Sequence, residues 1–339
     1  MYVLLKRIMF VSCLFISVCG YAGQSVCKKA DVSFSQFMDG KTEKVVYKSV
    51  SGKPLHLYTF CPDEFRKSDK RTAVVIIHGG GWTGGEVEAF FPHARYFASR
   101  GAVAFCVEYR LVKAGESTVE NCVSDCKSAM RYIRSHALEL GIDPNKIIVM
   151  GDSAGGHLAG CMGTVNGFDD PKDDLTVSDA PNMAILCNPL TDFTQSSFIK
   201  IVIGGQALKS RENPDVTSLS PEVISLAKRL SPLYNVRKNQ IYTLIMHGTA
   251  DKVISPSQSE ALCQAMKKAG NNCELVMLPG ASHAFVCVRW RAPEAEVVKT
   301  IRQIDDYMCR RGFLKGKSNL VLSDPEAWEP KKELQFIIK

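Results

Sequence analysis

The stretch Gly151-Asp152-Ser153-Ala154-Gly155-Gly156 directly follows an apolar run at residues 146–150. A G-x-S-x-G spacing at the carboxyl end of a strand predicts a tight strand-to-helix turn that presents the serine at the edge of a sheet. Glycines two residues before and two residues after the serine relieve the crowding of such a turn. The small residues that follow are typical of a helix packed closely on the sheet, with its positive N-terminal end under Ser153. Ser153 is therefore the candidate nucleophile.

Apolar runs alternate with helical patterns on both sides of this turn. Continuous apolar runs are typical of strands covered on both faces, and intervening helices make consecutive strands parallel. We predict an α/β fold with a mostly parallel, doubly wound sheet and helices on both faces, in one domain over residues 23–312. The expected strands are 45–50, 55–60, 73–77, 102–107, 146–150, 183–187, 242–246 and 274–278, and the expected helices are 87–99, 122–140, 256–269 and 293–310.

Two segments interrupt the alternation. Residues 193–238 mix polar and apolar residues, and we interpret them either as a small cap inserted over the carboxyl edge of the sheet or as an ordinary surface excursion. Residues 313–339 are charged, lack a clear period and form a C-terminal extension without an assigned role.

Composition excludes several classes of protein. The chain has 339 residues, of which 45% are hydrophobic and 23% charged, which is an ordinary globular composition. The formal net charge of +7 is spread along the chain without a basic block, which argues against a nucleic-acid partner. The chain lacks zinc-ribbon cysteine spacing and an H-E-x-x-H motif, so we expect no metal ion and no organic cofactor.

Residues 1–22 have the pattern of a signal peptide. Lys6 and Arg7 form a positive region, residues 8–18 are apolar, and Gly20-Tyr21-Ala22 provides small residues for cleavage. Eleven apolar residues are too few for a membrane span, so we expect a secreted or periplasmic protein without a stable span after cleavage. A retained N-terminal anchor and a lipoprotein modified at Cys19 are the less favoured alternatives.

An exported chain meets oxidising conditions, under which some cysteines pair. Of 13 cysteines, those outside the leader number eleven, so at least one stays unpaired within a single chain. Cys263 and Cys273 are the first candidates for a disulfide, because a helix ending near Gly270 folds back on the next strand. Cys122 and Cys126 are interpreted as buried, unpaired small residues.

The second motif is His78-Gly79-Gly80-Gly81-Trp82, directly after the strand expected at 73–77. Consecutive glycines expose backbone N–H groups that can bind a developing oxyanion. We expect the amides of Gly80, Gly81 and Ala154 to form this oxyanion hole. A phosphate-binding loop is disfavoured because the Lys-Ser/Thr pair is missing. His78 is expected to brace the loop.

A serine nucleophile needs a base and an acid that orients the base. His283 is the candidate base, because it follows the last core strand in a loop of small residues. His247 ends a strand and His136 lies on a helix, so both are interpreted as packing or capping groups.

Asp251 is the candidate acid, since it follows the strand preceding the His283 loop. Asp192 also follows a strand and is its rival. Asp152, next to the nucleophile, is expected to hold the local loop.

The motifs HGGGW, GDSAGGHLAG, HGTADKVISPSQS and GASHAF occur in this order between residues 78 and 285. In these motifs, the chain resembles the α/β-hydrolase superfamily, specifically the bacterial esterases grouped with hormone-sensitive-lipase-like enzymes and with acetyl-xylan and feruloyl esterases. The resemblance spans about residues 45–312 and implies an α/β-hydrolase fold with Ser153, Asp251 and His283 as the triad. It also implies a serine esterase that acts on short-chain acetyl-type or feruloyl esters of small molecules or carbohydrates. The chain departs from the group at Ile254-Ser255-Pro256, where Val-Pro is commoner.

Other interpretations remain open. A serine peptidase of the prolyl-oligopeptidase kind shares this core and order of motifs, and an inactive binding protein could use the same scaffold. Trp82 and Phe285 are candidates for stacking on a substrate ring or, equally, for the core.

Overall fold

The computed structural model describes residues 31–203, 219–238, 241–290 and 292–322. The signal peptide expected at residues 1–22 lies outside these ranges, as does the extension beyond residue 322. None of the helices in the described part is both long and apolar enough to cross a membrane.

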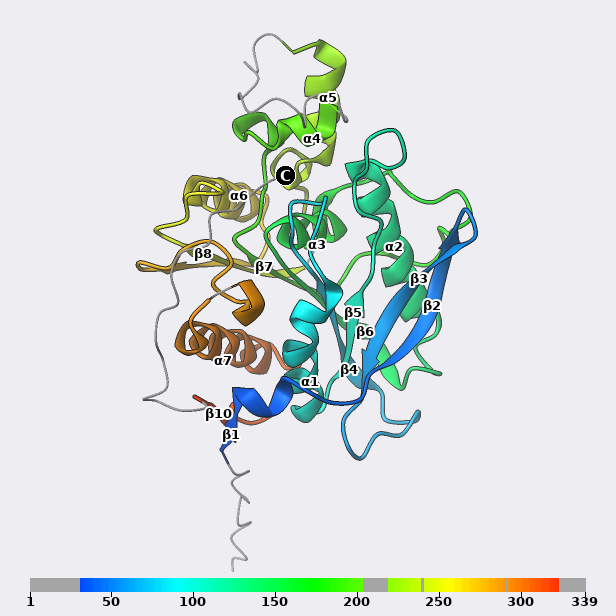
Figure 1. Cartoon of the computed structure of the whole chain (residues 1–339), viewed down its shortest axis with the longest axis vertical. Helices are drawn as coiled ribbons and strands as arrows, with labels where there is room; N and C mark the ends of the chain where they lie inside the picture. Colours follow the sequence, from blue (N-terminus) through cyan, green and yellow to red (C-terminus); the bar gives the residue numbers. More distant parts are fainter. Residues whose placement is uncertain (1–30, 204–218, 239–240, 291, 323–339) are drawn as a thin grey trace, which may run out of the picture. The chain divides into compact units, whose positions relative to one another are not determined.

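An eight-stranded sheet runs through the domain in the order β2-β3-β5-β4-β6-β7-β8-β9 (Figure 1). β2 and β3 form a hairpin, and β3 also pairs antiparallel with β5. All remaining neighbours are parallel, which confirms the predicted mostly parallel sheet. The strands are β2 Glu43–Val50, β3 Lys53–Phe60, β4 Arg71–Ile77, β5 Val103–Val107, β6 Ile142–Asp152, β7 Met183–Cys187, β8 Tyr242–Gly248 and β9 Cys273–Leu278.

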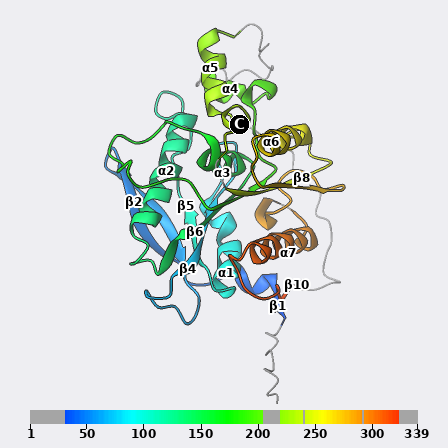
Figure 2. The same cartoon turned by 180° about the vertical axis from the view of Figure 1, so that it is seen from behind.

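Helices cover both faces of this sheet (Figures 1 and 2). The domain has two hydrophobic cores, one on each face of the sheet, and alternate residues of β4 point into them. Val75 and Ile77 pack with residues of α2, α3 and α6. Val74 and Ile76 pack with residues of α1 and α7. All four side chains are buried, as expected for a central strand of a doubly wound sheet. The helices are α1 Phe91–Ser99, α2 Val119–Ser135, α3 Ala154–Thr164, α6 Pro256–Lys268 and α7 Glu294–Arg310.

The ends of α2 differ from the prediction of 122–140. The helix begins at Val119 because the Asn121 side chain accepts a hydrogen bond from the Thr118 amide and caps the first turn. It ends at Ser135; in the turn that follows, Ala137 is still buried, whereas Leu138 is 78% exposed. The chain then turns through Gly141, which has φ +62°.

The helix expected at 87–99 is divided. Its first four residues form the 3-10 helix η2, Val87–Phe90, and the α-helix starts at Phe91. Pro92 lies in the first turn of α1, where its missing N–H costs no helical hydrogen bond.

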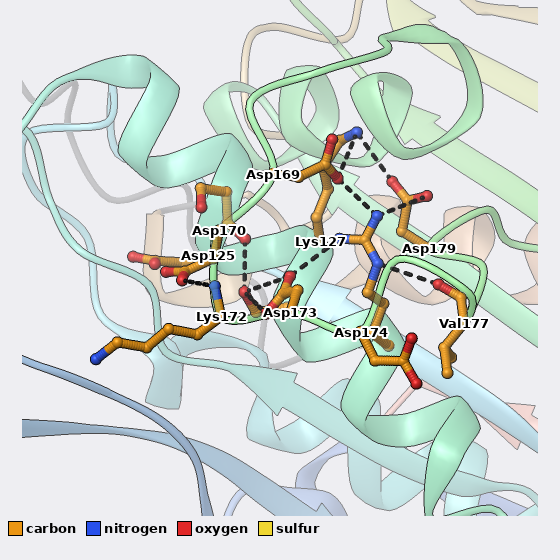
Figure 3. Close-up of polar contacts among 12 residues, drawn as sticks. Asp125, Lys127, Asp169, Asp170, Lys172, Asp173, Asp174, Val177 and Asp179 are labelled. Atoms are coloured by element: carbon orange, nitrogen blue, oxygen red, sulfur yellow. Dashed lines mark hydrogen bonds and ion pairs between the residues drawn. The ribbon is translucent and has the colours of Figure 1, made fainter.

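An ion-pair network fastens the loop between α3 and β7 to α2 (Figure 3). Lys127 Nζ lies 3.1 Å from a carboxylate oxygen of Asp179 and 3.4 Å from one of Asp169. The Arg131 guanidinium contacts Asp169 at 2.6 Å and Asp173 at 3.0 Å. The Lys127 side chain is 3% exposed, so its charge depends on these carboxylates.

The first part of the expected C-terminal extension packs on the domain. β10, Leu320–Val321, pairs in parallel with β1, Val32–Ser33. Thr72 donates a hydrogen bond to the Phe313 carbonyl, and Leu314 is buried. The expected domain boundary at residue 312 is therefore not a structural boundary.

The insertion at 193–238 forms short helices beyond α3 and α6 (Figure 1). Phe193 and Leu230 are fully buried in the core on the α3 face of the sheet. The insertion is thus anchored in the core, unlike a simple surface excursion. Its described helices are η3 Phe193–Gln195, α4 Ile199–Ile203, α5 Pro221–Leu230 and η6 Pro232–Asn235.

Candidate active site

Ser153 occupies the sharp turn between β6 and α3. Its backbone has φ 54° and ψ −118°, a conformation that non-glycine residues rarely adopt. The neighbouring backbones crowd this turn: a Cβ atom on Gly155 would lie 2.1 Å from the Ile77 carbonyl oxygen. The strained turn predicted from the G-x-S-x-G spacing is therefore present.

The structure brings Ser153, His283 and Asp251 together from three loops at the carboxyl edge of the sheet. His283 Nε2 lies 2.8 Å from Ser153 Oγ, and His283 Nδ1 lies 2.7 Å from Asp251 Oδ2. This hydrogen-bonded chain has the geometry that transfers a proton from a serine hydroxyl to an imidazole oriented by a carboxylate.

Four hydrogen-bond donors surround the Asp251 carboxylate. The amides of Val253 and Ile254 donate to Oδ1 at 2.8 and 3.0 Å. His283 and His247 both contact Oδ2. Burial alone would raise the pKa of Asp251, but the hydrogen bonds from His247, His283 and Ile254 outweigh it and hold the pKa well below its usual range. Asp251 is therefore an anion at neutral pH.

The loop after β4 has a backbone conformation that favours glycine at two positions. Gly80 has φ +116°, and a Cβ atom there would lie 2.3 Å from the Gly84 carbonyl oxygen. Gly81 has φ +61°, so a side chain is disfavoured at this position as well. Ala154 opens α3, and its amide lies at the positive end of that helix.

His78 braces this loop, as expected. Its Nδ1 lies 2.7 Å from the Gly79 carbonyl oxygen, and its ring stacks on Tyr109 with a centroid distance of 4.5 Å. The Tyr109 hydroxyl donates to the His78 carbonyl. Burial lowers the pKa of His78, which favours a neutral ring.

Asp192, the rival acid, is used elsewhere. Its Oδ1 accepts hydrogen bonds from the amide and hydroxyl of Thr194, and its Oδ2 accepts one from the Tyr234 hydroxyl. These contacts cap η3 and anchor the insertion, and they favour Asp251 as the acid.

Asp152 is fully buried next to the nucleophile. Burial raises the pKa of its carboxyl group to about 6, although the charge of His283 and the side chain of Asn188 favour the ionised form. A buried carboxyl group with a raised pKa thus lies next to the nucleophile.

The structure favours the core alternative for Trp82 and Phe285. Trp82 is 1% exposed, and its indole N–H donates to His157 Nδ1. Phe285 is fully buried in the core on the α7 face. Neither ring is available to stack on a substrate.

Two other aromatic side chains approach the glycine loop. A Cβ atom on Gly81 would meet the Phe198 ring at 4.0 Å, and one on Gly79 would meet the Trp290 ring at 2.7 Å. The sequence analysis missed both residues. Phe198 lies in the insertion and Trp290 lies beyond the His283 loop, so only the folded chain brings them to this loop.

His247 was interpreted as a packing or capping residue, but its side chain contacts Asp251. The spacing of four residues between His247 and Asp251 was the available signal. His136 does cap α2, where its Nδ1 lies 2.9 Å from the Tyr132 carbonyl oxygen.

The expected Cys263–Cys273 pair is in contact but not bonded. Both thiols are free, and Cys263 is close enough to Cys273 to help raise the pKa of its thiol, beside the larger effect of burial. Cys122 and Cys126 are buried, free thiols, as expected.

Comparison with known proteins finds esterases among the similar chains. Esterase 2 of Thermogutta terrifontis superposes with a TM-score of 0.72 at 37% identity, over 83% of this chain and 95% of that one. A probable isoprenylcysteine alpha-carbonyl methylesterase of Oryza sativa subsp. japonica is 27% identical over 227 residues, which are 63% of this chain and 51% of the relative. Carboxylesterase NlhH of Mycobacterium tuberculosis is 40% identical over 95 residues, which are 28% of this chain and 29% of the relative. The chain thus spans about half the length of the plant relative.

These similarities and the fold define an α/β-hydrolase of the esterase group, among the carboxylic ester hydrolases. The BD-FAE family matches residues 60–266, which is more than half of the chain. The chain belongs to the BD-FAE family.

Proposed function

We propose that the chain is an exported serine esterase that hydrolyses short-chain acyl esters through an acyl-enzyme. The observation that carries this proposal is the hydrogen-bonded chain from Ser153 through His283 to Asp251, with distances of 2.8 and 2.7 Å. An intact chain of this kind counts against an inactive scaffold.

The proposed reaction has two steps. Ser153 Oγ attacks the ester carbonyl carbon while His283 Nε2 takes the hydroxyl proton, and Asp251 stabilises the resulting imidazolium. The amides of Gly80, Gly81 and Ala154 hold the oxyanion. His283 then returns the proton to the departing alcohol, and water repeats the sequence to free the acid and Ser153.

The proposed preference for a small acyl group draws on a solved relative. Esterase 2 of Thermogutta terrifontis has been solved with propionate and with butyrate bound. A feruloyl ester or an acylated carbohydrate is a second candidate, supported by the motifs shared with feruloyl and acetyl-xylan esterases. Export is proposed from the pattern of residues 1–22.

The experiment is hydrolysis of p-nitrophenyl esters from acetate to octanoate by the mature chain. We expect acetate to butyrate to be cleaved fastest, and Ser153→Ala to lose at least about a thousandfold in kcat. Equal activity of Ser153→Ala would refute the assignment. Cleavage of an amide analogue in place of the esters would favour a peptidase.

A further inference from the structure

His247 lies at the end of β8, four residues before Asp251, with its side chain fully buried. Its Nε2 lies 3.1 Å from Asp251 Oδ2 and 3.0 Å from the Ile254 carbonyl oxygen. Its Nδ1 lies 2.7 Å from Ser259 Oγ, on α6. Both ring nitrogens therefore have partners, which come from two different elements.

These partners determine where the His247 proton lies. The carboxylate of Asp251 and the carbonyl of Ile254 can only accept hydrogen bonds, so Nε2 must carry a hydrogen. The hydroxyl of Ser259 can donate to or accept from Nδ1, so it completes the ring in either protonation state. The N–H of Nε2 is thus donated to the Ile254 carbonyl, with Asp251 Oδ2 3.1 Å from the same nitrogen.

We infer that His247 is a positioning residue, which holds the Asp251 carboxylate for His283 through the contact of its Nε2 with Oδ2 and its hydrogen bond to the Ile254 carbonyl of the same loop. This inference rests on the proposed function. Because two backbone amides hold Oδ1 and two imidazoles share Oδ2, the carboxylate cannot rotate without breaking one of these contacts. Hydrogen bonds to a carboxylate are stronger than those between neutral groups, so the restraint is substantial.

Two polar variants of similar size separate positioning from packing. His247→Gln places an amide N–H near the position of Nε2 and keeps a donor for Asp251. His247→Asn places its amide near Nδ1, next to Ser259, and leaves Asp251 Oδ2 to His283 alone. Thermal unfolding of each variant establishes that it is folded.

The measurements are kcat and KM for p-nitrophenyl acetate, together with the rate at which a fluorophosphonate probe labels Ser153. We expect His247→Asn to lose about tenfold or more in kcat with little change in KM, and to be labelled more slowly by a similar factor. His247→Gln should stay within about threefold of the wild type in both measurements.

Two results would overturn the inference: both variants matching the wild type, or equal activity of the two variants. The probe also separates this inference from the proposed function. If the wild-type chain is not labelled at Ser153, the proposed nucleophile is wrong, whatever the His247 variants do.

Discussion

A Cβ atom on Gly151 would lie 2.1 Å from the carbonyl oxygen of Gly155, across the turn that holds Ser153. Since real Cβ atoms do not approach this closely, Gly151→Ala must push the two backbones apart. We expect a loss of about 2–3 kcal/mol in the free energy of unfolding and at least about a hundredfold in kcat. Urea unfolding and hydrolysis of p-nitrophenyl acetate measure these effects.

The matched control is Gly163→Ala in α3. A Cβ atom there meets only the Ile241 side chain, at 3.6 Å. Alanine favours a helix over glycine by about 1 kcal/mol, so this variant should be unchanged or more stable. If the two variants behave alike, crowding at Gly151 is not what requires glycine in the turn.

The buried carboxyl group of Asp152 makes stability depend on pH. Burial raises its pKa to about 6 in the folded chain, above the ordinary value. The folded state therefore binds a proton at Asp152 more tightly than the unfolded state does between about pH 4 and 6. Proton binding at Asp152 stabilises the folded state at low pH, and this stabilisation is lost as pH rises through that window. Asp152→Asn should unfold with a free energy up to about 3 kcal/mol higher than the wild type at pH 7.5 and nearly equal to it at pH 4. Urea titrations at the two pH values check this, and a difference independent of pH would contradict it.

Phe198, which lies in the insertion, approaches the glycine loop at Gly81. Truncation of this ring should open space for the acyl chain. We expect Phe198→Ala to raise kcat/KM for p-nitrophenyl octanoate relative to acetate by about tenfold, the usual effect of a few methylenes in an apolar pocket. Phe65→Ala is the control, because Phe65 packs at Gly141, near the amino end of β6. If the ratio of kcat/KM for octanoate to that for acetate changes equally in both variants, Phe198 does not line the acyl site.

The ion-pair network in Figure 3 predicts a salt-sensitive contribution to stability. Lys127→Met removes one of the two cations that contact Asp169 and Asp179 in this network. Arg131 is the cation that stays. We expect a loss of about 2 kcal/mol in the free energy of unfolding, since removal of one partner leaves buried charge uncompensated. Lys172→Met, an exposed lysine of the same loop, should change stability by less than about 0.5 kcal/mol. Molar salt should narrow the difference between the two variants, and a difference that grows with salt would contradict the electrostatic origin.

The contact between Cys263 and Cys273 predicts that these two thiols can form a disulfide under oxidising conditions. Burial raises the pKa of the Cys273 thiol, so few thiolates form at neutral pH and spontaneous oxidation should be slow. In an oxidising compartment we expect the pair to form a disulfide that stabilises the chain by about 2–3 kcal/mol. Mass spectrometry of the chain expressed with its leader should find this cross-link, with Cys122 and Cys126 still reduced. A reduced pair in that sample would refute the prediction.

Much of the fold and the central geometry of the site could be predicted from the sequence. The run at 183–187 coincides with β7, because every residue of that strand is buried and apolar. The triad could be predicted because parallel strands bring the loops after β6, β8 and β9 to one edge of the sheet.

The remaining features depend on contacts between distant segments. The end of α2 could not be predicted from spacing, since the apolar pattern continues through Ala137 and Leu140 into the turn after the helix, where Ala137 is still buried. Trp82 was a candidate for the substrate site because it adjoins the glycine loop, but its ring turns into the core toward His157. Phe198 takes the position next to the loop instead, from a part of the chain more than a hundred residues further on.

The pairing of β1 with β10 constrains when the molecule can finish folding. Val32 has its partner, Leu320, only after nearly all of the domain has left the ribosome. The central sheet likewise lacks β9 until residue 278 has been made. Translation therefore yields an incomplete domain until its last stages.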